Sequence, residues 1–119
     1  MIERAIQIYE AKLGPDHYRV GIGLNNLGDL HREAGRLDTA EPYYRRALEI
    51  FQGALGPEHI NVSFPLKGLA DLCRDSDRRR EADEFYRRAL AIREKTLPPD
   101  NEMLKTTKDD YQQFLEMSE

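Results

Sequence analysis

The sequence predicts an all-α solenoid, in which antiparallel pairs of helices stack side by side. The first observation is a repeat: Leu13, Leu55 and Leu97 each open a connector that contains proline, and both spacings are 42 residues. The second is the helical spacing of apolar residues between these connectors. The third is a composition with 34% charged residues and few β-branched ones, which suits exposed helices. A fixed period of roughly 20 to 50 residues marks stacked units that bury their apolar faces against one another.

Each repeat is predicted to contain two helices. In the first complete repeat, Leu24, Leu27 and Leu30 lie at helical spacing on one segment, and Tyr44 and Leu48 do so on the next. The same pattern gives six helices, at about 1–13, 18–34, 38–54, 60–76, 79–96 and 102–117. We expect one domain, 1–119, made of the second helix of an incomplete unit (1–17), two full repeats (18–59 and 60–101) and a C-terminal capping helix (102–119).

Turn-forming residues separate the predicted helices. Gly35 is suited to end the first helix of a repeat in a left-handed conformation. Asp38 follows as a plausible N-cap, and Glu41 three residues later completes a capping-box pattern. In the connector, Pro15 blocks continuation of the preceding helix and Asp16 can accept hydrogen bonds from the free amides of the following one. We therefore expect a tight turn inside each repeat and a capped helix start after each connector.

One motif carries a family resemblance. It reads Leu24-x-x-Leu27-Gly28-x-x-His31, with Ala40, Tyr44 and Ala47 further on, and recurs as Leu66-x-x-Leu69-Ala70-x-x-Cys73 with Ala82, Tyr86 and Ala89. This pattern resembles the tetratricopeptide repeat. The 42-residue period and the connector Leu-Gly-Pro-Asp/Glu-His resemble the kinesin light chain subtype, although Asp77 replaces the turn glycine found at Gly35. The resemblance implies a right-handed superhelix of helix pairs.

The resemblance also implies a peptide-binding groove, because in this family the first helix of each pair lines the concave face. By register, the candidates for peptide binding are Asn25, Asn26, Asp29, Arg32, Phe64, Lys67, Asp71 and Arg74, with Ile22, Glu33 and Asp75 on the same faces. Asparagine can donate to and accept from an extended peptide backbone, and the three cations can hold acidic side chains or a terminal carboxylate. We therefore expect a protein or peptide ligand, possibly an acidic one.

The charged candidates also fit a purely structural role. Asp29 with Arg32, and Asp71 with Arg74, have helical i,i+3 spacing and can compensate each other on a solvated face. Acidic residues likewise interleave with the basic run Arg78-Arg79-Arg80, Arg87 and Arg88. Mixed charge of this kind is typical of a salt-bridged helix surface and disfavours a polyanion site.

Catalytic, cofactor and metal sites are not indicated by the sequence. His17 and His59 occupy the same slot of successive repeats and are interpreted as connector residues, and His31 is interpreted as a buried structural histidine. Cys73, the single cysteine, is expected to act as a small core residue. The sequence contains no glycine-rich phosphate loop, nucleophile elbow or pair of catalytic carboxylates. We expect no enzyme activity and no cofactor.

Composition narrows the classes of partner. A net charge of -4 argues against general affinity for nucleic acid, and no segment approaches the roughly 18 apolar residues of a membrane span. A single cysteine favours a cytoplasmic location. The favoured function is a non-catalytic interaction module or scaffold. Two alternatives stay open: a self-associating structural fragment, whose apolar N-terminal edge (Ile2, Ile6 and Tyr9) forms a homodimer, and a helper domain appended to a hydrolase or transferase.

Overall fold

A computed structural model describes residues 6–7, 10, 14 and 17–117 of the chain. This part contains five helices and no strand: α2 (Tyr18–Glu33), α3 (Leu37–Leu55), α4 (Ile60–Asp75), α5 (Arg79–Thr96) and α6 (Glu102–Met117). Their ends differ from the predicted ones by at most one residue. The predicted helix 1–13 lies mostly outside the described residues, although Ile6, Gln7 and Glu10 are described and helical. The described part of the chain therefore holds five helices in place of the six predicted.

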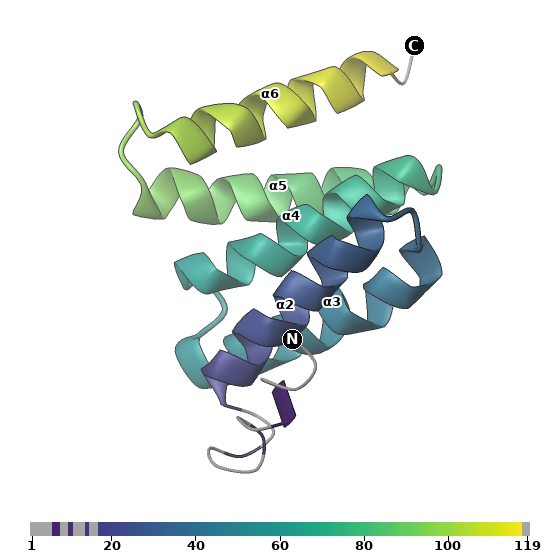
Figure 1. Cartoon of the computed structure of the whole chain (residues 1–119). Coiled ribbons are helices and arrows are strands. Elements are labelled where there is room, and N and C mark those ends of the chain that lie inside the picture. Colours follow the sequence, from purple (N-terminus) through teal and green to yellow (C-terminus); the bar gives the residue numbers. More distant parts are fainter. Residues whose placement is uncertain (1–5, 8–9, 11–13, 15–16, 118–119) are drawn as a thin grey trace.

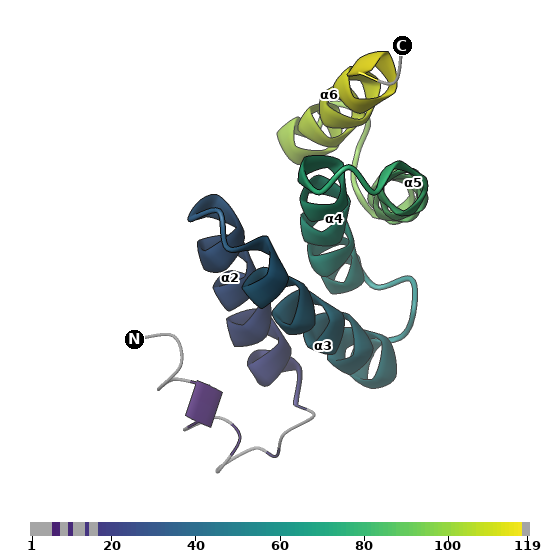
Figure 2. The same ribbon diagram turned by 90° about the vertical axis from the view of Figure 1, so that its right-hand side faces the viewer.

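The helices form two antiparallel pairs followed by a single helix (Figure 1). α2 packs against α3 and α4 packs against α5, while contacts of α3 with α4 and of α5 with α6 join the successive units. Figure 2 shows α2, α4 and α6 following one another along one side of the molecule, with α3 and α5 on the other. Because α2 also contacts α4, the first helices of the two repeats lie side by side in one layer. The described structure is elongated, measuring 47 × 32 × 21 Å.

The core repeats with the sequence. Matched positions of the two repeats are buried in both, at Val20/Val62, Leu24/Leu66, Leu27/Leu69, Ala40/Ala82, Tyr44/Tyr86 and Ala47/Ala89. On α6, Phe114 joins the same core, and its ring lies 5.2 Å from that of Tyr86. Burial of one large apolar side chain contributes about 1.5–3 kcal/mol, so packing within each helix pair and packing between neighbouring units both stabilise the fold.

Tyr44 is the point at which α2, α3 and α4 converge. Its side chain, from α3, is fully buried and lies against Gly28 of α2 and Gly68 of α4. A Cβ atom added at Gly28 would lie 2.7 Å from Tyr44 Cδ1, and one added at Gly68 would approach the ring still more closely. The two glycines therefore create the space that the tyrosine fills.

Histidine side chains cap α2 and α4, the helices that follow the first two connectors. His17 Nδ1 and His59 Nδ1 each accept a hydrogen bond from the backbone N–H two residues on, at 3.1 Å in both cases. Asn101 holds the equivalent slot before α6, and its Oδ1 accepts from the backbone N–H of Leu104. The two histidines are therefore both connector residues, as predicted, and N-caps of the following helices. The predicted cap Asp16 lies outside the described residues.

The turn inside each repeat differs in part from the prediction. Gly35 has a φ of +83°, as expected of a left-handed terminator, and Asp77 takes a φ of +60° in the second repeat. The predicted capping box at Asp38 is wrong, since α3 already begins at Leu37 and its N-cap residue makes no side-chain hydrogen bond to the helix start. Asp38 lies instead in the first turn, where a negative charge interacts favourably with the helix dipole.

Arg78 joins the second helices of the two repeats. Its guanidinium donates to both carboxylate oxygens of Glu41 on α3, at 2.7 and 3.0 Å, and also to Glu81. These hydrogen bonds from Arg78, reinforced by Arg45, hold the pKa of Glu41 at about 2. Arg87 forms an ion pair with Asp83 one turn earlier in α5, at 3.1 Å. The prediction of a salt-bridged surface is confirmed for Arg78 and Arg87.

Ile6, near the N-terminus, packs onto α2. Ile6 is 5% exposed, and a Cβ atom added at Gly23 would lie 2.6 Å from Ile6 Cγ1. The expectation that Ile6 contributes to an open apolar edge is therefore wrong, because α2 covers its side chain. Ile2 and Tyr9, the other residues of that predicted edge, lie outside the described residues.

Replacement of Gly68 by alanine is expected to destabilise the protein by about 1–3 kcal/mol, because the new methyl group would overlap the buried Tyr44 ring. Gly53, inside α3, is the matched control, since nothing lies within 4 Å of a Cβ added there. Gly53→Ala should stabilise the protein by about 0.5–1 kcal/mol through helix propensity. Urea unfolding of both variants measures the difference, and equal effects would contradict this account of the packing.

Candidate functional site

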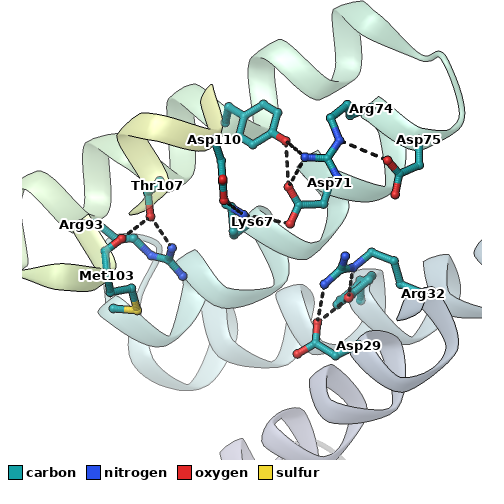
Figure 3. Close-up of polar contacts among 12 residues, drawn as sticks. Asp29, Arg32, Lys67, Asp71, Arg74, Asp75, Arg93, Met103, Thr107 and Asp110 are labelled. Carbon is teal, nitrogen blue, oxygen red and sulfur yellow. Dashed lines mark hydrogen bonds and ion pairs between the residues drawn. The ribbon is translucent and has the colours of Figure 1, made fainter. Parts of the chain in front are cut away.

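Two of the charged candidates on α2 are bound to the core tyrosine. The Tyr44 hydroxyl donates to Asp29 Oδ1 at 2.5 Å and accepts from Arg32 Nε at 3.0 Å. An ion pair between Arg32 and Asp29, at 3.7 Å, completes this first triad (Figure 3). Burial, together with the adjacent carboxylate, raises the pKa of Tyr44. The predicted i,i+3 pair is thus present, and it is tied to the second helix of its repeat.

The second repeat contains an equivalent triad. The Tyr86 hydroxyl donates to Asp71 Oδ1 at 2.7 Å and accepts from Arg74 at 3.3 Å. Lys67 adds a connection that the first repeat lacks, since its Nζ lies 2.8 Å from a carboxylate oxygen of Asp71 and 2.8 Å from one of Asp110 on α6. Figure 3 shows these side chains between α4 and α6. Three of the groove candidates in the second repeat, Lys67, Asp71 and Arg74, thus serve the contacts between helices.

A hollow of about 290 Å³ lies between the first helices of the two repeats. Its lining comes from α2, α3 and α4 and consists of Ile22, Asn25, Asn26, Phe51, Asn61 and Phe64. None of these residues carries a formal charge. Ile22 and Phe64 are exposed although both are large and apolar. The structure thus brings Asn25, Asn26 and Phe64 of the predicted set together, and it places the charged candidates outside this hollow.

Asn25 has an unsatisfied polar atom. The residue is 8% exposed, and its Oδ1 is the one buried side-chain oxygen or nitrogen among the described residues without a hydrogen-bond partner. A buried acceptor left unpaired costs about 1–3 kcal/mol. Since Asn25 lines the hollow, a donor placed there by a ligand would recover part of this cost.

Arg93 is a buried cation beside the same hollow. It is 4% exposed, and its guanidinium donates to Ser63 Oγ at 3.0 Å and to Thr107 Oγ1 at 2.6 Å. It also lies 5.2 Å from the ring centroid of Phe64, while no carboxylate of a described residue comes within 4.0 Å. Burial lowers the pKa of Arg93, although Asp71 and Asp110 oppose this effect. Neutral hydroxyl groups and an aromatic ring therefore hold a charge that has no direct counter-ion in the described part of the chain. Figure 3 shows the contact with Thr107.

Sequence reasoning missed Phe51 and Arg93 because it considered only the first helices of the repeats, and it missed Asn61 although this residue lies on the first helix α4. Phe51 and Arg93 lie 42 residues apart and occupy the same slot of successive repeats. An arginine at a slot that is apolar in the preceding repeat is the signal that could have identified Arg93. Asn61 stands three residues before Phe64, and this spacing places both on one face of a helix.

The other polar candidates have local roles. His31 is partly exposed, contrary to the prediction of a buried histidine; it stacks on Tyr43 and accepts from Arg36 Nε at 2.9 Å. Cys73 is buried as predicted, and burial raises the pKa of its thiol to about 11. The described residues contain no cluster of potential metal ligands. None of the described helices is both long and apolar enough to cross a bilayer.

Removal of the two tyrosine hydroxyls should have unequal effects. The side chain of Asp71 is 10% exposed and that of Asp29 is 42% exposed, so water can replace the lost hydrogen bond only at Asp29. Tyr86→Phe should lower the free energy of unfolding by about 1.5–3 kcal/mol, and Tyr44→Phe by about 0.5–1.5 kcal/mol. Urea unfolding at pH 7 checks this order, and a larger loss for Tyr44→Phe would refute it.

Comparisons with known proteins agree with this architecture. A family model described as tetratricopeptide repeat matches residues 1–52 and 22–95, and no curated protein matches the chain. The solved structure of BtubC (BKLC) from P. vanneervenii superposes with a TM-score of 0.86 at 24% identity, over 98% of this chain and 47% of BtubC. A Podosopora anserina protein with nearly identical TPR-like repeats, assigned to the kinesin light chains, gives a TM-score of 0.83 at 18% identity, over 95% of this chain and 54% of that protein.

At the level of the fold, these structural matches confirm the predicted resemblance to kinesin light chain-like repeats. The chain spans about half the length of both proteins, at 47% and 54%. The family model covers most of the sequence and includes both helix pairs. The chain belongs to the tetratricopeptide repeat family.

Proposed function

We propose that the chain is a non-catalytic protein-interaction module that binds an extended peptide segment of a partner protein along α2, α4 and α6. Tetratricopeptide repeats generally act as interaction modules, and stacked repeats present extended concave surfaces. The proposal includes the right-handed superhelical arrangement implied by the resemblance. The unpaired Oδ1 of Asn25 is the observation that carries it, because Asn25 lines a hollow whose other residues are apolar or carry side-chain amides.

The lining indicates what the ligand presents to the hollow. Ile22, Phe51 and Phe64 offer apolar surface suited to one apolar side chain. Asn25 can accept a hydrogen bond from a ligand backbone N–H, and Asn26 and Asn61 can donate or accept at the rim. An extended strand fits this combination, because it exposes backbone groups and side chains alternately.

Arg93 favours an acidic group in the ligand, next to the apolar side chain. Its Nη2 donates to no acceptor among the described residues, while its Nε and Nη1 are already bonded. A ligand carboxylate at this nitrogen would supply the counter-ion that the neighbouring side chains do not provide. In the proposal, Asp29, Arg32, Lys67, Asp71 and Arg74 act mainly by holding the groove helices in place and contact the ligand only at its edges.

Replacement of Asn25 by leucine should separate binding from stability. Leucine keeps the branched shape and the number of heavy atoms but removes the buried acceptor, so the fold should be about as stable as before. Peptides selected from a random phage-displayed library on the immobilised protein should bind Asn25→Leu about 10-fold more weakly, which corresponds to about 1.4 kcal/mol. Fluorescence anisotropy gives the dissociation constants, and Arg88→Ala on the exposed face of α5 is the control that should leave them unchanged.

Two outcomes would overturn the proposal. One is that Asn25→Leu binds the selected peptides as tightly as the parent protein. The other is that no peptide is selected above background while sedimentation shows a concentration-dependent dimer, as the alternative of a self-associating fragment requires. A cytoplasmic location remains a prediction from the single cysteine.

A further inference from the structure

The imidazole of His59 caps the start of α4, so the protonation state of this side chain affects the first turn of the helix. Its backbone φ and ψ, -68° and 145°, are those of an extended N-cap residue, and its Nδ1 accepts from the backbone N–H of Asn61. A nitrogen accepts a hydrogen bond only through a free lone pair, so this cap requires the neutral imidazole with its proton on Nε2. Protonation would remove the acceptor and place a positive charge at a helix N-terminus, where the dipole disfavours it.

The first turn of α4 holds residues that contact both parts of the proposed binding site, the hollow and Arg93. Asn61 lines the hollow, and Phe64 follows it by three residues. Ser63, in the same turn, donates to the backbone carbonyl of Ile60 and accepts from Arg93. Loosening of this turn would therefore displace a lining residue and one of the two hydroxyl acceptors that hold Arg93.

The charged groups around His59 do not titrate over the same range. Glu58, the preceding residue, is paired with Lys95 of α5 at 2.5 Å. This pairing lowers the pKa of Glu58, so that carboxylate stays ionised above pH 5. Lysine side chains keep their proton well above pH 8. Histidine is the side chain that ordinarily changes charge between pH 5 and pH 8.

We propose that His59 is a protonation-sensitive cap that loosens the first turn of α4 as the pH falls from 8 to 5. The direction of the pH effect follows from the hydrogen bond. The cap stabilises the helix start while the imidazole is neutral, and this stabilisation is lost as the imidazole gains a proton. The consequence for binding rests on the proposed function, but the cap itself does not. The chain contains its own comparison, because Asn101 caps α6 from the equivalent slot through an amide that does not titrate.

Two-dimensional ¹H–¹⁵N NMR spectra of the ligand-free protein between pH 8 and pH 5 test the cap directly. The amide resonance of Asn61 should shift along a sigmoid in pH, whereas that of Leu104, which donates to Asn101, should stay nearly constant. In His59→Asn, which copies the third connector, the sigmoid at Asn61 should disappear. The fall in Tm between pH 8 and pH 5 should also shrink by roughly 4 °C.

A constant Asn61 resonance in the parent protein would overturn the proposal. So would an equal shift at Leu104, or an unchanged sigmoid in His59→Asn. The parent protein alone supplies the comparison of Asn61 with Leu104, so the proposal stays testable even if the variant does not fold. Because no ligand is used, failure of the cap would leave the proposed peptide binding untouched, and the reverse also holds.

Discussion

The ring of Tyr44 between Gly28 and Gly68 is the contact on which the rest of the groove depends. Three helices meet there, and the two glycines allow approaches that any Cβ atom would prevent. The buried ring also carries its hydroxyl to Asp29 and Arg32 at the surface of α2. One side chain thus sets the spacing of α2 and α4 and orients two charged groups between them. The hollow that holds Asn25 lies between the same two helices.

Much of this arrangement is the same in both repeats, and the position at which the two repeats differ belongs to the candidate binding site. The triads around Tyr44 and Tyr86 are copies in which the same three residue types make the same contacts. Phe51 and Arg93, by contrast, occupy one repeat slot with opposite character. Phe51 lines the hollow. Arg93 lies against the ring of Phe64 and donates a hydrogen bond to Thr107 of α6. A cation at a core position is costly without partners, so it is more informative about function than the repeated residues are.

The helices could be predicted closely from sequence, because apolar spacing, Gly35 and the proline connectors are local signals. The caps could not, since Asp16 and His17 are both acceptable acceptors in the same connector and only the backbone geometry decides between them. Register alone places Asn25, Asn26 and Phe64 on the inner layer, and the structure brings them together at the hollow, while their part in peptide binding stays a prediction. Register could not show that Lys67 bridges to Asp110, because that contact depends on how α6 sits against α4. Arg93 was missed because it lies on α5, a second helix, and only the first helices were considered.

A double-mutant cycle on Tyr44 and Gly68 tests the central packing claim most directly. Gly68→Ala should become neutral or stabilising, by up to about 1 kcal/mol, once Tyr44→Ala has removed the ring that the new methyl group would meet. The coupling free energy from urea unfolding of the four proteins should therefore be at least about 1 kcal/mol. Additive effects within about 0.5 kcal/mol would contradict the claim that these two residues set the spacing of the groove helices.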